Sequence, residues 1–310
     1  MALRTAEQYR QGLRDGRVVY YRGEQVEDVT THEHLSLGVD HTSLDFDLAE
    51  DEDHRELFSW ADDDGILHSR YYKHPASAQD LLNRREMIET STRLGGSTVL
   101  LIKEIGTDAL FALDLVSRVI DEKAGTDYHE RVTAFHQHAR DHDLALAVAQ
   151  TDVKGDRALL PSEQEHPDYY VRIVEERADG IVVRGCKAHT TNTPMVDEII
   201  VLPTRALAEQ DAAYAVAFAI PVNTPGVKLM ASPFGASERR STFHYPGVRI
   251  PARLFEHLKE IDFIGEKFLV PDPPEEFLRF KYGPDWEIPK PDTYVEDVVK
   301  LIPANPIPGV

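Results

Sequence analysis

Cysteine is nearly absent from this sequence of 310 residues, in which Cys186 is the only one. A single thiol cannot form a disulfide within the chain, and it cannot supply the several thiolates that an iron–sulfur cluster needs. Cys186 follows Gly185 in a segment with strand character. We therefore predict a small buried thiol at this position rather than a catalytic nucleophile.

Long apolar runs are absent as well, and basic residues are few. No segment approaches the roughly 18 apolar residues of a membrane span, and the N-terminal sequence has no apolar core of signal-peptide length. The 34 Lys and Arg residues stand against 54 Asp and Glu residues, which gives a formal net charge of −20. Because such a surface repels phosphate backbones, we expect no binding of nucleic acid. The lack of a signal-peptide core and of a membrane span predicts a cytoplasmic protein that does not bind membranes.

Helical patterns dominate residues 1–143, apart from a predicted hairpin at Arg22-Gly23 and connections with short helical pieces over residues 30–75. Ser77 is a suitable N-cap for a helix in which four apolar residues lie near one face, namely Leu81, Leu82, Ile88 and Leu94. The helix after it is apolar on most sides, which predicts a central position. The predicted helices cover residues 6–15, 78–94, 99–123 and 128–143.

A strand-rich segment follows over residues 144–235. Six apolar or alternating runs of strand length are separated by turn residues such as Asp179-Gly180 and Pro225-Gly226. Because no long helix lies between these runs, they predict an antiparallel β-barrel or sandwich. The sequence thus indicates an α+β protein, with a mainly helical domain over residues 1–143 followed by a β-domain.

The remaining segment, residues 236–310, has a different composition. Eleven of the 19 prolines lie between Pro246 and the end of the sequence, which argues against long regular elements there. We expect one short helix around residues 252–260 and another around residues 275–281.

Two motifs in the β-domain carry a family resemblance. The first predicted strand ends in the turn TDVKGDR at residues 151–157, and the sequence GCKAHTTN stands at residues 185–192. They are similar to the T-E-P-x-x-G-S-D-like turn and the G-x-K-x-W-I-T-N signature of the acyl-CoA dehydrogenase fold, with His189 at the Trp place and Thr191 at the Thr place. The chain most resembles the 4-hydroxyphenylacetate 3-hydroxylase and 4-hydroxybutyryl-CoA dehydratase family, over residues 15–235.

This resemblance implies a flavin cofactor, FAD. A flavin needs hydrogen-bond partners along its pyrimidine edge and at N5, and amides and hydroxyls at strand ends supply them without adding charge. By resemblance, Gln150, Thr151 and Thr191 line that edge, Thr190 belongs to the same site, and His189 stacks on or flanks the ring. The alternative interpretation is that these are ordinary turn residues of a β-barrel.

The sequence departs from the two best-known chemistries of the family. The dehydratase binds an iron–sulfur cluster through cysteines at C-x-x-x-C spacing, and Leu100 and Glu104 stand at the matching places. Since thiolates hold such clusters, we exclude cluster-dependent dehydration. The aromatic hydroxylases carry an Arg, a Tyr and a His for a phenol, and here Ile105, Ala109 and Val148 take those places. A hydroxyphenyl substrate is therefore not expected.

The family also has a C-terminal four-helix domain, which we interpret as missing here. The tail, residues 236–310, contains IDFIGEKFLVPDPPEEFLRFKYGPDWEIPKP. This stretch is similar to the C-terminal segment of phosphorylcholine-transferase and fukutin-like nucleotidyltransferases, whose acidic metal-binding core has no counterpart in this sequence. We interpret the stretch as a structural cap.

Charged residues near the motifs are candidates for binding a substrate. In the family the turn at residues 151–157 lies near bound substrate, so Lys154, Asp156 and Arg157 are candidates to position an anionic or thioester small molecule. A turn stabilised by a surface ion pair is an equally good interpretation. His138 and His142 have a spacing that can bind zinc, but a solvated His-rich face explains them more simply, so we predict no metal site.

The leading hypothesis from the sequence is an FAD-dependent oxidoreductase, monooxygenase- or dehydrogenase-like, or a subunit of one. Glu104 is the best candidate for a catalytic acid or base, and Asp108 lies on the same predicted helix. A partner chain or a homodimer interface would complete FAD binding, so we expect a homo- or hetero-oligomer. A non-catalytic scaffold subunit is the alternative, and a transferase-related role through the tail is a weaker one.

Overall fold

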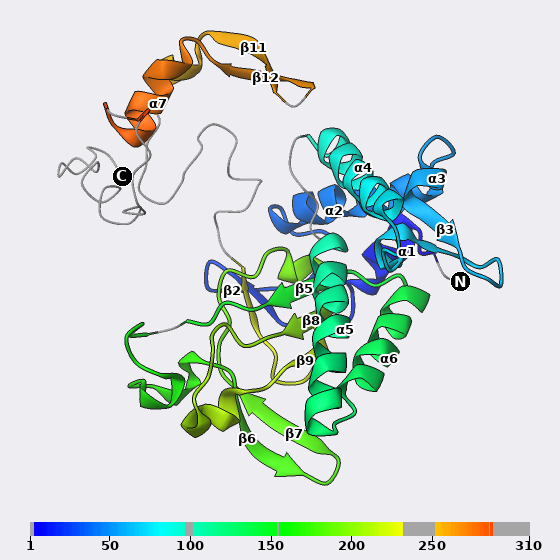
Figure 1. Ribbon diagram of the computed structural model, residues 1–310, viewed down its shortest axis with the longest axis vertical. Coiled ribbons are helices and arrows are strands. Elements are labelled where there is room, and N and C mark those ends of the chain that lie inside the picture. Colours follow the sequence, from blue (N-terminus) through cyan, green and yellow to red (C-terminus); the bar gives the residue numbers. More distant parts are fainter. Residues whose placement is uncertain are drawn as a thin grey trace. The chain divides into compact units, whose positions relative to one another are not determined.

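The computed structural model comprises two compact units, Met1–Glu238 and Arg239–Val310 (Figure 1). Each unit is described by itself below, and the predicted boundary between residues 143 and 144 stays a prediction. The structure describes residues 3–96, 102–153, 155–231, 252–263, 265–284 and 286–287. None of the helices in these ranges is long and apolar enough to cross a membrane.

Capping residues fix the ends of several helices in the first unit. The Thr5 side chain accepts from the backbone N–H of Gln8, and the Gln8 side chain accepts from Thr5 N–H in return, which starts α1. Ser77 caps α4 as predicted, by accepting from Asp80 N–H at 3.2 Å. Gly125 ends α5 in the left-handed conformation, with φ of 66°. The helices are α1 (Ala6–Gly12), α2 (Leu35–Glu50), α3 (Arg55–Phe58), α4 (Ala78–Leu94), α5 (Glu104–Ala124) and α6 (Tyr128–Asp141).

Two helix predictions differ from the structure. Helix α5 begins at Glu104, five residues later than the predicted start at residue 99; residues 99–101 lie outside the described ranges. The predicted apolar face of α4 is not its buried face, because Leu81 is 57% exposed and Leu94 52% exposed. Met87 is fully buried instead, and it joins a small cluster with Phe58 and Tyr71 that turns this side of α4 inward.

Helix α2 was not predicted, although it has 16 residues. Its sequence lacks a clear apolar period because Thr42, Ser43 and Asp45 are among its buried residues. Their side chains find partners inside the protein: Tyr9 and Thr42 share a hydrogen bond of 2.9 Å between their hydroxyls. Buried polar residues that are hydrogen-bonded to distant elements are invisible to a search for apolar periodicity.

The strands of the first unit do not form the predicted antiparallel barrel. Its central sheet has the order β5-β8-β9, in which β5 (Leu146–Ala149) pairs in parallel with β8 (Glu198–Val201), and β8 pairs antiparallel with β9 (Phe218–Pro221). Strands β6 (Arg172–Arg177) and β7 (Gly180–Arg184) form a separate two-stranded hairpin, which lies between β5 and β8 in the sequence. The long connection from β5 to β8 gives the chain room for the crossover that a parallel pair requires. In the described residues the sheet does not close.

The N-terminal hairpin joins the end of the strand-rich segment. Strands β1 (Val19–Tyr21) and β2 (Glu24–Val26) pair across Arg22-Gly23, which confirms the predicted hairpin. Strand β1 also pairs in parallel with β10 (Leu229–Ala231). A further short hairpin, β3 (Ser59–Ala61) with β4 (Leu67–Ser69), lies between α3 and α4 in sequence.

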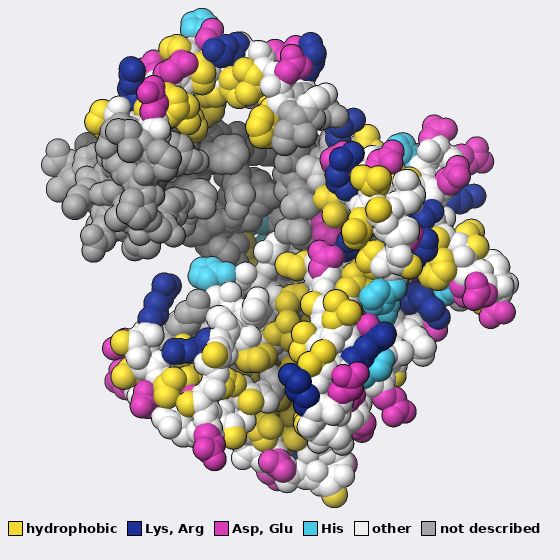
Figure 2. Space-filling view, in the orientation of Figure 1, with side chains coloured by type: hydrophobic (Ala, Val, Ile, Leu, Met, Phe, Trp, Pro, Cys, Tyr) yellow, Lys and Arg dark blue, Asp and Glu magenta, His cyan; other side chains and the backbone are white. Residues whose placement is uncertain are grey.

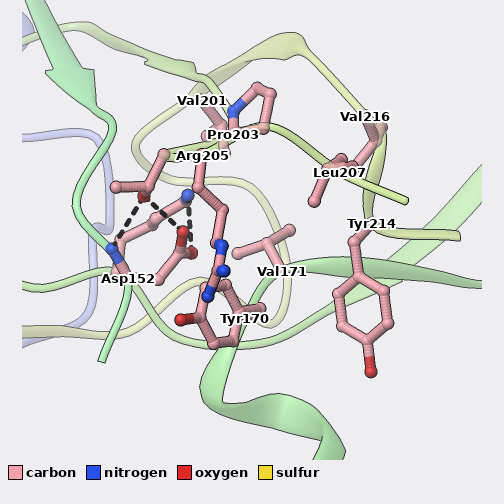
Figure 3. Close-up of a pocket in the computed structure, with 11 residues that line it drawn as sticks. Asp152, Tyr170, Val171, Val201, Pro203, Arg205, Leu207, Tyr214 and Val216 are labelled. Atoms are coloured by element: carbon pink, nitrogen blue, oxygen red, sulfur yellow. Dashed lines mark hydrogen bonds and ion pairs between the residues drawn. The ribbon is translucent and has the colours of Figure 1, made fainter. Parts of the chain in front are cut away.

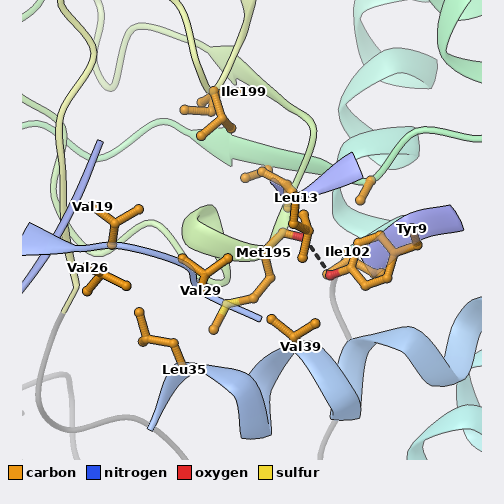
Figure 4. Close-up of a cluster of buried hydrophobic side chains, with 14 of the residues drawn as sticks. Tyr9, Leu13, Val19, Val26, Val29, Leu35, Val39, Ile102, Met195 and Ile199 are labelled. Carbon is orange, nitrogen blue, oxygen red and sulfur yellow. Dashed lines mark hydrogen bonds between the residues drawn. The ribbon is translucent and has the colours of Figure 1, made fainter. Parts of the chain in front are cut away.

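One apolar core connects α1, α2 and the central sheet (Figure 4). Met195 lies in its middle, and its carbonyl accepts a hydrogen bond of 2.7 Å from the Tyr9 hydroxyl. Because the Tyr9 side chain also stacks on Phe46 of α2, with ring centroids 4.5 Å apart, it ties three parts of the unit together. A second cluster packs α5 and α6 against the other side of the sheet, through Leu110, Ala139, Leu146 and Ile200.

The second unit contains a hairpin and one helix. Strands β11 (Leu258–Phe263) and β12 (Glu266–Pro271) pair antiparallel, and α7 (Pro274–Tyr282) follows. Helix α7 confirms the helix predicted around residues 275–281. The helix predicted around residues 252–260 is wrong beyond its first turn, Ala252–Phe255, because the sequence LKEIDF forms β11 and pairs with β12.

Candidate functional site

The two family-like motifs meet at the end of β5. The strand ends at Ala149, and Asp152 then forms a single antiparallel bridge with Lys187. The backbone N–H of Ala188 donates to the Thr151 carbonyl at 2.8 Å. The sequence turn that starts at Thr151 therefore lies beside the segment that carries His189 and Thr191, as two segments of one site would.

A buried ion pair holds this strand end together. The Lys187 ammonium lies 2.6 Å from Asp152 Oδ1, and the two side chains are 11% and 2% exposed. The ammonium also donates to the carbonyls of Gln150 at 3.0 Å and Leu202 at 2.7 Å. Burial lowers the pKa of Lys187, while its hydrogen bond to Asp152 opposes that shift. With these three contacts, the ammonium joins the end of β5 to the segments after β7 and β8.

Thr204 completes this strand-end tie from the segment after β8. Its hydroxyl lies within hydrogen-bonding distance of the Gln150 carbonyl and of Asp152 Oδ2, the latter at 2.5 Å. Asp152 N–H donates back to Thr204 Oγ1 at 3.2 Å. A small, narrow pocket lies next to the tie (Figure 3). Its walls are mostly apolar and aromatic, from Tyr170, Val171, Val201, Pro203, Leu207, Tyr214 and Val216.

The predicted flavin residues lie around this tie with different degrees of exposure. Gln150, His189 and Thr191 are exposed, whereas Thr151 and Thr190 are half-buried. His189 has a left-handed backbone with φ of 56°, in a segment that turns sharply before the 3-10 turn Thr193–Met195. The Thr193 hydroxyl donates to the Thr190 carbonyl at 3.1 Å, which fixes that turn.

Gly185 allows the second motif to reach the strand end. Its φ is 145°, and a Cβ there would lie 2.4 Å from the Tyr170 carbonyl oxygen and 2.5 Å from Val171 Cα. Backbone atoms cannot move aside as a flexible side chain can, so only glycine fits this close approach. Cys186, the next residue, is exposed, and the prediction of a buried thiol is therefore wrong. Strand β7 ends at Arg184, two residues before Cys186, so the cysteine is not part of the strand.

The predicted substrate residues belong to the turn after Asp152. Lys154 lies outside the described residues. The Asp156 carboxylate accepts from Ala158 N–H at 2.8 Å, and the Gln164 amide donates to the Asp156 carbonyl at 2.7 Å. Arg157 is exposed. Asp156 thus stabilises its own turn in the way that Asp residues favour, and its role toward a substrate stays a prediction.

The two predicted catalytic residues lie apart from the flavin-type residues along the sheet. Glu104 is the first residue of α5 and is 4% exposed. The helix packs against the start of β5, where a Cβ on Gly106 would lie 2.3 Å from Leu146 Cβ. Gln150 follows the other end of this strand, roughly 13 Å away at the usual rise per residue. Asp108 is more accessible and pairs with Arg84 at 2.7 Å.

A buried group of ionisable residues surrounds the start of α5, and sequence reasoning missed it. Lys103 and Asp143 form an ion pair of 2.8 Å with both side chains fully buried. Burial raises the pKa of Asp45 to about 8; the charge of nearby Glu104 adds to the rise and that of Lys103 opposes it. Tyr71 donates to Asp45 Oδ1 at 3.2 Å. The partner of Lys103, Asp143, lies 40 residues further along the chain. The sequence around Lys103 therefore did not predict that it would be buried in an ion pair.

The candidate zinc histidines bind protein groups. His138 Nε2 lies 3.2 Å from Glu198 Oε1, and His142 Nδ1 lies 2.8 Å from the His138 carbonyl. In the described part of the chain, no group of three or more His, Cys, Asp or Glu side chains is arranged to hold a metal ion.

Solved structures of related enzymes share the fold of this chain. An oxygen-tolerant 4-hydroxybutyryl-CoA dehydratase from N. maritimus matches with a TM-score of 0.69 at 33% identity, over 74% of this chain and 45% of the other. The oxygenase component of 4-hydroxyphenylacetate 3-monooxygenase, complexed with FAD, matches with a TM-score of 0.63 at 28% identity, over 72% of this chain and 45% of the other.

Sequence relatives agree with the structural ones. A 4-hydroxybutyryl-CoA dehydratase/vinylacetyl-CoA-Delta-isomerase from Clostridium aminobutyricum is 37% identical over 74% of this chain and 46% of its own length. The oxygenase component of 4-hydroxyphenylacetate 3-monooxygenase from Thermus thermophilus is 31% identical over 68% of this chain and 43% of its own length. The chain thus spans less than half the length of these relatives.

The family description that matches the sequence is 4-hydroxyphenylacetate 3-hydroxylase N terminal, over residues 5–251. This range includes the strand-end tie, both motifs and the helices that pack on the central sheet. The chain therefore belongs to the 4-hydroxyphenylacetate 3-hydroxylase N-terminal family, with the acyl-CoA dehydrogenase-like fold of its solved relatives.

Proposed function

We propose that this protein is an FAD-dependent oxidoreductase, or a subunit of one, that holds the flavin at the end of β5. The observation that carries the proposal is the hydrogen bond of 2.8 Å between Ala188 N–H and the Thr151 carbonyl, which brings the two motifs side by side. A solved relative of the same family contains FAD, and that relationship supports the cofactor assignment.

The chemistry of the strand end suits a flavin. Thr151, Thr190 and Thr191 offer hydroxyls, and Gln150 offers an amide, so the donor set is neutral and polar. The ammonium of Lys187, in the same motif, is held by Asp152 and two carbonyls. Neutral donors can bind the pyrimidine edge and N5 without fixing one charge state of the ring, and FAD when bound would supply the redox chemistry.

Family membership supports a flavin cofactor more directly than it supports a particular reaction or substrate. The dehydratase relative is named for a CoA thioester, and the monooxygenase relative for a hydroxyphenyl acid. We propose a small anionic or thioester substrate, positioned by the turn that carries Lys154, Asp156 and Arg157. Glu104 remains our first candidate for an acid or base. Its side chain is buried at the start of α5, near Asp45.

Binding of FAD to the purified chain tests the proposal. We expect the wild-type protein to retain FAD through gel filtration, with a flavin absorption band in the protein fraction. Thr191→Ala should weaken the affinity about fivefold, because one net hydrogen bond contributes roughly 1 kcal/mol. Fluorescence titration with FAD measures the change.

Thr31→Ala is the matched control, since Thr31 is an exposed threonine in an earlier segment of the chain. It should bind FAD as the wild type does. If the wild-type chain retains no FAD, alone or as an oligomer, the flavin proposal fails for this polypeptide. The alternative, a non-catalytic subunit of a flavoenzyme, would then be favoured.

A further inference from the structure

Two buried carboxyl groups lie near each other, one on α2 and one at the start of α5. Acidic side chains are spread over the visible surface in Figure 2, where water stabilises their charge. Asp45 is only 1% exposed, however, and Glu104 only 4%. Acidic residues are almost never buried so completely unless a partner compensates their charge. The surroundings of these two side chains therefore decide which of them can be ionised.

The ammonium beside these carboxyl groups has a carboxylate of its own. Lys103 forms an ion pair of 2.8 Å with Asp143, and both side chains are fully buried. Its ammonium also lies 3.7 Å from the centre of the Phe46 ring. The charge of Lys103 opposes the rise in the pKa of Asp45 without cancelling it. One cation thus stands against the carboxyl groups of Asp143, Asp45 and Glu104.

A second basic side chain reaches the start of α5 but is directed elsewhere. Arg84 of α4 donates to the backbone carbonyl of Glu104 at 2.9 Å. Its ion pair, of 2.7 Å, is with the more accessible Asp108. Arg84 therefore caps the backbone at this point and gives its charge to a carboxylate nearer the surface.

The two oxygens of Asp45 differ in their hydrogen bonds. Tyr71 donates to Oδ1 at 3.2 Å. Oδ2 is buried and has no hydrogen-bond partner among the residues that the structure describes. An ionised carboxylate can only accept hydrogen bonds, whereas a protonated one also donates. A proton on Oδ2 would neutralise the buried group and make this oxygen a donor, for which the nearby carboxylate of Glu104 is a suitable acceptor.

We propose that Asp45 and Glu104 form an acid pair, which holds one proton and one negative charge between the two side chains. Two negative charges in a dry interior are disfavoured by burial and by mutual repulsion, and one proton relieves both. Asp45 is then a positioning residue, because it keeps a proton beside Glu104. To act as an acid, Glu104 takes that proton: an O–H bond on Asp45 breaks, one forms on Glu104, and the negative charge moves to Asp45.

This role in a reaction rests on the proposed function, in which Glu104 is the candidate acid or base. The shared proton itself needs no flavin, so it is measured on the full chain without FAD. A chain that retains FAD but lacks the proton keeps the proposed function and loses the acid pair. A chain that has the proton but retains no FAD gives the opposite result, so the two failures are distinguishable.

Infrared spectroscopy detects the proton directly. A protonated carboxyl group has a C=O stretching band separate from the bands of carboxylates and backbone amides. We expect this band in the wild type at neutral pH, and we expect it to disappear as the pH rises through about 8, the pKa of Asp45. Asp45→Asn should remove the band. Asp47→Asn is the matched control, since Asp47 is exposed on the same helix, and it should keep the band.

The midpoint of this titration tests the coupling to Glu104. Glu104→Gln removes a neighbouring negative charge, so the band should persist while its midpoint falls by about one pH unit. Glu122→Gln, at an exposed position of α5, should leave the midpoint unchanged. Because Glu104→Gln keeps Asp45, it tests the pair even if Asp45→Asn does not fold, which circular dichroism checks. A wild type without the band, a band that survives in folded Asp45→Asn, or an unchanged midpoint in Glu104→Gln overturns the proposal.

Discussion

Protonation of Asp45 links the interior of the protein to pH. Its folded pKa of about 8 results mainly from burial, whereas an Asp in an unfolded chain titrates near about 3.9. Between these values the folded protein keeps a proton that the unfolded chain has lost. Unfolding thus releases a proton, and the free energy of unfolding falls as pH rises, by roughly 1.4 kcal/mol per pH unit for this group.

Asp45→Asn should remove that dependence. The amide stays neutral, so we expect the variant to lose less stability than the wild type between about pH 6 and pH 8, the upper part of the titration window. Urea unfolding at several pH values measures the two slopes. Asp47→Asn, an exposed position on the same helix, serves as the control and should keep the wild-type slope. Parallel slopes for wild type and Asp45→Asn would contradict the assigned protonation.

Close packing of a helix on a strand can be tested at Gly106. Alanine would favour helix α5 by up to about 1 kcal/mol through propensity. Its Cβ, however, would lie 2.3 Å from Leu146 Cβ, and relief of that clash requires the helix and β5 to separate. Overpacking of this kind costs about 1–3 kcal/mol. We therefore expect Gly106→Ala to lower the melting temperature despite the better helix former.

Gly38 of α2 provides the matched comparison. A Cβ there would meet Met195 Cε at 2.5 Å, but this atom is the end of a flexible side chain that can change rotamer. Gly38→Ala should therefore destabilise less than Gly106→Ala. Thermal unfolding of the two variants measures the difference, and equal losses would argue against close packing of α5 on β5 as the cause.

Sequence patterns predicted individual elements better than their assembly. Local signals such as Ser77 and Gly125 marked real helix ends, because capping depends on neighbouring residues. The order and direction of strands depend on contacts between distant segments, so the parallel pairing of β5 with β8 was missed. Helix α2 was missed for a related reason, since its buried polar residues have their partners elsewhere in the fold.

At the scale of the whole molecule, the candidate site also combines local motifs, which the sequence reveals, with contacts between distant segments, which it does not. Motif spacing identified the segments at residues 150–151 and 189–191, and the structure brings them to one strand end. The Asp152–Lys187 pair and Thr204, which hold that strand end, gave no separate signal, because their pairing exists only after folding. The resemblance therefore suggested which segments to compare, whereas the contacts that hold the strand end together required the three-dimensional structure.

The parallel pairing of β1 with β10 has a consequence for synthesis of the protein. Val19 pairs with Leu229, so an emerging chain must wait for nearly the whole first unit before its earliest strand gains this neighbour. Until then β1 has an open backbone edge, and such edges invite pairing with other chains. We expect translation pauses within residues 30–228 to leave an intermediate that depends on chaperones. Pauses after residue 231 should allow β1 to pair with β10.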